Sequence, residues 1–190
     1  MPLSIAILGW GSLIWDEHPA FDRHHHQWES DGPQLPIEFA RVSKTRAGAL
    51  TLVLDSAYGT LCTTAYALSK RSDPEDAICD LRSREDTTRK NIGYFFADGS
   101  AQQARDSAAL GLIASWATAK SLDIVVWTDL PSNFQSETGH SFSVDAAVEY
   151  VESLPPAGKA ATAAYVWQAP KLVVTPLRTE LQSRPWFGQQ

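Results

Sequence analysis

Cysteine is scarce in this chain, and long apolar runs are missing. The two cysteines, Cys62 and Cys79, are too few for a scaffold held together by several disulfides. The apolar segment Leu3–Leu8 is far shorter than the roughly 18 apolar residues of a membrane span. It is also shorter than the ~7–15 residues of a signal-peptide core, and no Lys or Arg precedes it. We therefore expect a cytoplasmic protein without a membrane partner.

An excess of positive charge is missing as well. The 16 Lys and Arg residues are outnumbered by 22 Asp and Glu residues, which gives a formal net charge of −6. Proteins that bind nucleic acid or anionic membranes through charge carry a basic patch or stripe. The composition therefore argues against nucleic acid as a partner. Hydrophobic residues make up 44% of the chain, which excludes intrinsic disorder.

The length of 190 residues is sufficient for one hydrophobic core. No internal repeat or linker divides the sequence, so we expect a single domain over residues 1–190. Four short segments in the first half have the apolar or alternating pattern of strands: Leu3–Leu8, Pro36–Ser43, Leu50–Leu54 and Leu61–Leu68. Strands at this spacing favour an antiparallel sheet or a barrel.

Helices follow and mix with further strands. Asp73 is a suitable helix cap, and Pro74 suits the first helical position. Three more helices and three more strands are expected in the second half: helices at Ser100–Lys120, Ser143–Leu154 and Lys159–Trp167, and strands at Ile92–Ala97, Leu122–Trp127 and Leu172–Thr175. The tail Arg184–Gln190 is expected to be loose. Because strands and helices do not alternate strictly, the pattern favours the α+β class.

The first candidate site is the loop of residues 9–13, Gly-Trp-Gly-Ser-Leu, directly after the first strand. Its two glycines permit a tight turn and close approach of a ligand to the backbone. Successive N–H groups in such a turn form a concavity that binds anions. A dinucleotide-binding fingerprint is incomplete, because position 14 is Ile where a third glycine belongs. A purely structural turn is the alternative interpretation.

The second candidate is Glu85, near the end of the helix that begins at Pro74. Three residues precede it on the same helical stripe, at steps of four, three and four: Pro74, Ile78 and Leu81. Burial on this face would raise the pKa of the carboxyl group, which suits a general acid/base near neutral pH. The alternative is a frayed helix end, with Glu85 turned to solvent or paired with Arg84 or Arg89.

Histidines supply weaker candidates. The segment His24–His26 places three adjacent imidazoles in different directions, and no cysteine or carboxylate has the spacing of a zinc ligand. We expect a solvated loop there and no metal site. His140 has the chemistry of a base, but no nucleophile motif accompanies it.

Three motifs occur in one order along the chain. The strand Leu3–Leu8 leads into Trp10-Gly11-Ser12-Leu13; the segment Leu81–Glu85 reads Leu-Arg-Ser-Arg-Glu; Gly93-Tyr94 follows. Together they resemble the γ-glutamylcyclotransferase superfamily, above all its ChaC-type branch. That branch has a Tyr-Gly-Ser-Leu loop, a Leu-x-x-Arg-Glu segment with the catalytic glutamate, and a later Gly-Tyr. The resemblance covers about residues 3–97.

The resemblance implies a small closed mixed β-barrel with packed helices. It also implies that a small-molecule γ-glutamyl substrate is cyclised to 5-oxoproline with release of its amine, and that no cofactor or metal takes part. Glu85 would then be the catalytic general acid/base. The residues implied to bind substrate are Trp10, Gly11, Ser12, Leu13 and Tyr94.

Two departures from that pattern leave alternatives open. Trp10 stands where the family usually has Tyr, and residues 87–92 separate Asp86 from Gly93 by a longer gap. A non-catalytic, small-molecule-binding member of the same fold is the alternative that these departures suggest. An unrelated enzyme with the loop as a phosphate cradle is another, although no Lys or Arg lies near the loop. No motif indicates the leaving amine or the oligomeric state.

Overall fold

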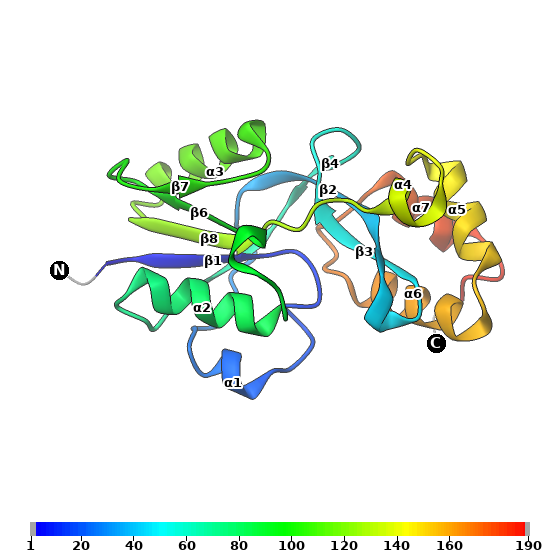
Figure 1. Cartoon of the computed structure of the whole chain (residues 1–190), viewed down its shortest axis with the longest axis horizontal. Helices are drawn as coiled ribbons and strands as arrows, with labels where there is room; N and C mark the ends of the chain where they lie inside the picture. The colour runs from blue at the N-terminus through cyan, green and yellow to red at the C-terminus, as the bar shows by residue number, and fades with distance from the viewer. Residues whose placement is uncertain (1–2, 189–190) are drawn as a thin grey trace. The chain divides into compact units, whose positions relative to one another are not determined.

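The computed structural model describes residues 3–188, which divide into two compact units (Figure 1). The first unit contains residues 3–35 and 63–130, and the second contains residues 36–62 and 131–188. Helices and two sheets are present, so the expected α+β class is confirmed. The expectation of a single domain stays a prediction.

The first unit is built on a five-stranded mixed sheet. Its strands, in spatial order, are β5 (Ala65–Leu68), β1 (Ile5–Gly9), β8 (Ile124–Thr128), β6 (Ile92–Phe96) and β7 (Gln102–Gln103). The β1 and β8 strands are parallel, and every other neighbouring pair is antiparallel. The central strands β1 and β8 are buried almost throughout, which agrees with their continuous apolar sequences.

Helices cover both faces of this sheet. The helical segments of the unit are α1 (Pro19–Asp22), α2 (Pro74–Arg84), the 3₁₀ turn η2 (Arg89–Asn91) and α3 (Ser107–Ala119). Figure 1 shows α2 and α3 on opposite sides of the sheet. Ile78 and Leu81 of α2 pack with Ile7 and Val126 in one fully buried cluster. The predicted stripe of α2 therefore faces the sheet.

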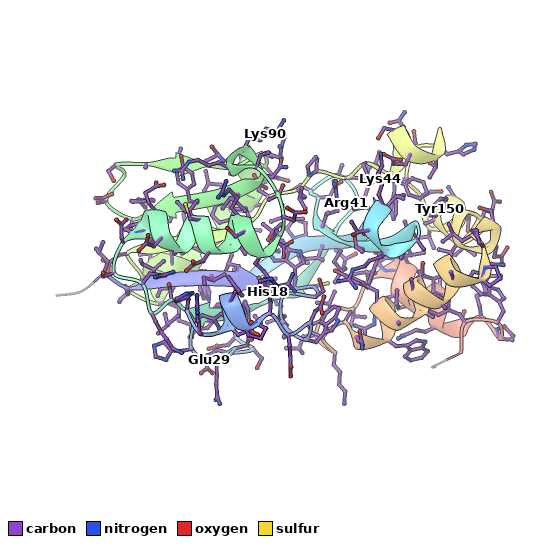
Figure 2. The ribbon with its side chains drawn as sticks, turned by 60° about the horizontal axis from the view of Figure 1, so that its bottom comes forward. His18, Glu29, Arg41, Lys44, Lys90 and Tyr150 are labelled. Carbon is purple, nitrogen blue, oxygen red and sulfur yellow. The ribbon has the colours of Figure 1, made fainter. Side chains whose placement is uncertain are left out.

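The second unit combines a three-stranded sheet with helices. Its sheet has the order β3 (Ala49–Leu54), β2 (Gln34–Ser43) and β4 (Thr60–Thr63). Its helical segments are η1 (Lys44–Arg46), α4 (Phe134–Thr138), α5 (Val144–Ser153), α6 (Pro156–Gln168) and α7 (Pro176–Ser183). Polar contacts supplement the packing: the Tyr150 hydroxyl donates to the Gly48 carbonyl at 2.8 Å, and Lys44 pairs with Glu137 at 3.0 Å. Figure 2 labels Lys44 and Tyr150 among the side chains of the chain.

Neither sheet of the described chain closes into a barrel, so the closed barrel implied by the resemblance is not what residues 3–188 form. The expected strand Leu61–Leu68 is interrupted at Thr64. Both the backbone N–H and the hydroxyl of Thr64 donate to the Pro33 carbonyl. Thr64 is thus withdrawn from regular strand pairing, and β4 and β5 belong to two different sheets.

Local capping explains two further differences from the predicted elements. The helix expected from Ser100 begins at Ser107, because the Asp106 carboxylate accepts the N–H groups of Ala108 and Ala109. The expected strand Leu172–Thr175 is absent, because Thr175 instead caps α7.

Three helices, α1, α4 and α7, were not predicted. The tail is not loose as far as it is described: Phe187 is only 2% exposed, and the last two residues of the predicted tail lie outside the described range. Among the described residues, no helix has the length and apolar character that crossing a membrane requires.

Candidate functional site

The loop after β1 is partly built into the protein interior. Trp10 and Leu13 are buried, whereas Ser12 keeps intermediate exposure. The Gly11 carbonyl accepts the Ile14 N–H at 3.0 Å, and the Ser12 carbonyl accepts the Asp16 N–H at 2.8 Å. These two bonds wind residues 11–16 into consecutive turns.

Gly9 at the base of the loop has a packing role. A Cβ atom at this position would lie 2.8 Å from Cζ3 of Trp28. Only glycine lets the Trp28 ring lie so close to the backbone. In the part of the chain that the structure describes, the N–H groups of Gly11, Ser12 and Leu13 donate no hydrogen bond. These three N–H groups therefore have no acceptor within the described chain.

Glu85 lies at the C-cap of α2, where a Schellman motif ends the helix. The Thr87 N–H donates to the Arg82 carbonyl at 3.1 Å, and the Asp86 N–H donates to the Ser83 carbonyl at 3.3 Å. Asp86 occupies the left-handed position that this motif requires, with φ of 43°. The backbone that carries Glu85 is thus fixed by the turn that follows it.

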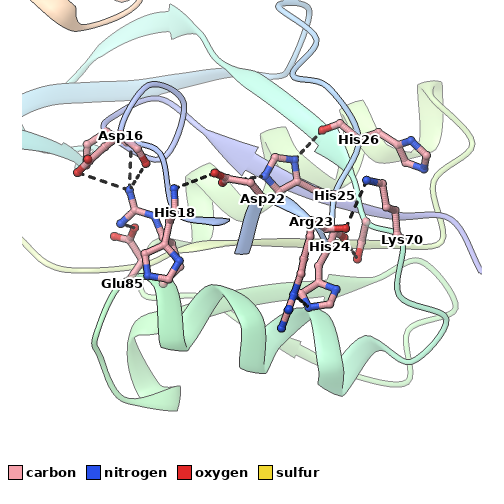
Figure 3. Close-up of polar contacts among 12 residues, drawn as sticks. Asp16, His18, Asp22, Arg23, His24, His25, His26, Lys70 and Glu85 are labelled. Carbon is pink, nitrogen blue, oxygen red and sulfur yellow. Dashed lines mark hydrogen bonds and ion pairs between the residues drawn. The ribbon is translucent and has the colours of Figure 1, made fainter. Parts of the chain in front are cut away.

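Arg84 joins this helix end to the loop. Its Nη2 donates to the Ser12 carbonyl at 3.3 Å and to the Asp16 carbonyl at 3.1 Å. The guanidinium also lies 3.7 Å from the Asp16 carboxylate and 3.8 Å from the Glu85 carboxylate. Figure 3 shows the contacts with Asp16 next to the end of α2 that carries Glu85. One side chain therefore bridges two motifs 72 positions apart.

The Glu85 carboxylate is accordingly held near the loop rather than turned into bulk solvent. Its side chain is 19% exposed, and the Arg84 side chain is 10% exposed. Arg89, the other partner considered from sequence, forms its ion pair with Glu75. The structure thus contains one element of the alternative interpretation, the pairing with Arg84. The position of the Glu85 carboxylate in a site with the loop stays a prediction.

Tyr94 packs against the buried cluster of the first unit, which includes Leu13 of the loop. Its ring contacts Phe96 at a centroid distance of 5.9 Å, and the Arg89 guanidinium lies 5.5 Å from its centre. The preceding glycine has a packing role, because a Cβ on Gly93 would overlap the Trp127 indole. The role of Tyr94 in substrate binding stays a prediction.

The histidine segment differs from the expected solvated loop. His25 is buried, with its ring 4.9 Å from that of Phe21 and 5.2 Å from that of Trp28. Its Nδ1 lies 2.6 Å from the His26 carbonyl, and its Nε2 lies 3.6 Å from the Asp22 carboxylate (Figure 3). Aromatic packing over the base of the loop explains this burial.

The other candidates from sequence contribute no further site. His140 is exposed in the second unit. Cys62 is buried and Cys79 is exposed. Within residues 3–188, no group of three His, Cys, Asp or Glu side chains is arranged to hold a metal ion.

The sequence interpretation considered Arg84 only as a partner of Glu85, and it missed both the contact of Arg84 with the loop and the contribution of Asp16. A signal for Arg84 was present in the helix pattern. Arg84 follows the buried residues Ala77 and Leu81 at steps of seven and three, so it extends the buried face of α2. A charged residue at such a position needs a polar partner, and the loop carbonyls provide it. No comparable signal marks Asp16, which lies in an irregular segment.

Comparisons with models of known protein families, with curated proteins and with solved structures gave no significant match.

Proposed function

We propose that this chain is a γ-glutamylcyclotransferase-like enzyme that converts a γ-glutamyl amine or peptide to 5-oxoproline. The observation that supports it is the Arg84 guanidinium, which donates to the Ser12 carbonyl of the loop at 3.3 Å and lies 3.8 Å from the Glu85 carboxylate. The two motifs that resemble the family's catalytic segments thereby adjoin one another. The proposal rests on this site and on the order of the motifs, not on a closed barrel.

The proposed reaction is an internal acyl transfer. The α-amine of the γ-glutamyl group attacks its own side-chain carbonyl, and a C–N bond forms to close a five-membered lactam. The C–N bond to the leaving amine then breaks. One proton leaves the attacking nitrogen and one reaches the departing amine, so that no water, oxidant or cofactor is consumed.

Glu85 is the residue proposed to carry the proton. A partly buried carboxylate accepts it from the attacking nitrogen and returns it to the leaving amine. The N–H groups of Gly11, Ser12 and Leu13 are proposed to bind the substrate carboxylate or the developing oxyanion. Positioning of the two reacting groups of one substrate supplies the remaining rate enhancement.

A non-catalytic, small-molecule-binding protein is the second candidate. The observation that favours it is the burial of Trp10, which is only 5% exposed. The family usually has Tyr at this position, and a buried indole provides no hydroxyl to a substrate. Under this alternative, 5-oxoproline or a γ-glutamyl compound binds but is not converted.

The test is a screen for 5-oxoproline release from γ-glutamyl amino acids, γ-glutamyl amines and glutathione. We expect Glu85→Gln to lower turnover of the best substrate by about 10²–10⁴-fold, because glutamine keeps the shape but transfers no proton. Asp76→Asn is the matched control, since Asp76 is exposed on the same helix and away from the loop. Equal turnover in wild type and Glu85→Gln would remove Glu85 from the mechanism. Binding without turnover in the wild type would favour the second candidate.

A further inference from the structure

The Arg84 guanidinium has an environment that stability alone does not explain. Only 10% of the side chain is exposed, yet both carboxylates around it lie beyond 3.5 Å. Its close partners are two backbone carbonyls of the loop, those of Ser12 and Asp16. In addition, its Nε is buried without a hydrogen-bond partner among the described residues. A buried N–H without an acceptor destabilises the folded state, and such a group is a candidate for a functional role.

From these contacts we infer that Arg84 is the positioning residue of the proposed reaction, acting through the loop on one side and through Glu85 on the other. This inference rests on the proposed function. Arg84 is not proposed to contact the reacting atoms of the substrate. Its proposed effects are to orient the Leu13 N–H and to favour the ionised form of the Glu85 carboxylate.

The first effect follows from peptide geometry. In a trans peptide unit, the carbonyl and the N–H of the next residue point in opposite directions. The bond from Arg84 to the Ser12 carbonyl therefore fixes the direction of the Leu13 N–H. The second bond, to the Asp16 carbonyl, holds the other end of the same turns. Arg84 thus pre-orients a backbone donor that the proposal assigns to the oxyanion.

The second effect is electrostatic. A positive charge 3.8 Å from the Glu85 carboxylate favours its ionised form, which is the form that accepts a proton. Asp16 shares the same cation at 3.7 Å and moderates its influence. The remaining charged neighbours on this stretch of helix, Arg82 and Asp86, are exposed. Arg84 is therefore a charged neighbour of the proposed base that is largely withdrawn from solvent.

The experiment compares Arg84→Gln, Arg84→Lys and the control Arg82→Gln, whose side chain is exposed on the same helix. For Arg84→Gln we expect kcat to fall by roughly 10²-fold, with a smaller change in KM, because a misplaced donor acts mainly on the transition state. The acid limb of the pH–rate profile should move to higher pH. Arg84→Lys retains the positive charge but not the planar pair of donors of the guanidinium. We therefore expect the acid limb of its pH–rate profile to stay at the wild-type position and its kcat to fall in part.

Hydrogen exchange of the amides in residues 11–16 provides a readout that does not depend on turnover. We expect faster exchange in Arg84→Gln and no change in Arg82→Gln. Turnover, pH profile and hydrogen exchange that are all unchanged in Arg84→Gln would overturn the inference. If Arg84→Gln fails to fold, the same three measurements on Arg84→Lys replace it. An inactive wild type would overturn the proposed function alone. In that case, accelerated exchange would show only that Arg84 orders the loop, and unchanged exchange would refute that contribution as well.

Discussion

Gly93 is the position at which the smallest change should have the largest effect on stability. A Cβ atom there would lie 2.5 Å or less from three indole atoms of Trp127. Ordinary carbon contacts are about 3.5–4.0 Å long, so Gly93→Ala must displace the indole or the backbone by about 1 Å or more. Trp127 is only 1% exposed, so its ring is enclosed by the core.

The magnitude follows from the cost of overpacking. Extra atoms in a well-packed core typically cost about 1–3 kcal/mol. We therefore expect Gly93→Ala to lower the free energy of unfolding by about 1–3 kcal/mol, which corresponds to a fall in Tm of roughly 2–12 °C.

Gly111 provides a matched control for the same substitution. It lies within α3, is exposed, and a Cβ atom added to it would meet no other atom within 4 Å. Gly111→Ala should therefore raise stability by about 0.5–1 kcal/mol through helix propensity. Thermal and urea unfolding of both variants measure the contrast. A Gly93→Ala protein with the Tm of the wild type would refute the close packing of Gly93 against Trp127.

Two further predictions concern a buried carboxylate and a helix end. Burial raises the pKa of the Glu38 carboxyl, although the hydrogen bonds that it accepts from the Thr175 hydroxyl and the Phe39 N–H act in the opposite direction. The folded state therefore binds a proton at Glu38 more readily than the unfolded state does. The stabilising contribution of the protonated carboxyl is complete below the pKa of the unfolded state and is lost as pH rises through the higher pKa of the folded state. Urea titrations should therefore show Glu38→Gln gaining stability relative to wild type as the pH rises above about 4. Asp86→Gly should raise Tm by roughly 1–4 °C, because glycine adopts φ of 43° without a Cβ penalty, and an unchanged or lower Tm would count against strain at this position.

Several elements could be predicted because their causes are local. Asp73 accepts the Glu75 N–H at 2.9 Å and Pro74 occupies the first turn, so the start of α2 is encoded in two adjacent residues. The spacing of Ile78 and Leu81 likewise determined which face of α2 is buried. The candidate loop was recognisable because glycines directly after an apolar strand indicate a turn wherever they occur.

Tertiary contacts determined the structural features that the sequence analysis did not predict. The strand predicted through Thr64 is divided because Pro33, 31 residues away, offers the carbonyl that Thr64 binds. His25 is buried because the rings of Phe21 and Trp28 enclose it, although its sequence neighbours are polar.

The link between the two candidate motifs also depends on the tertiary structure. The sequence by itself determined that Glu85 stands near the end of an amphipathic helix and that a glycine loop follows the first strand. Only the folded chain brings the Ser12 carbonyl within 3.3 Å of Arg84. The physical reason is that helix and turn formation depend on residues a few positions apart, whereas a buried guanidinium takes whichever carbonyls the packing of the chain places around it.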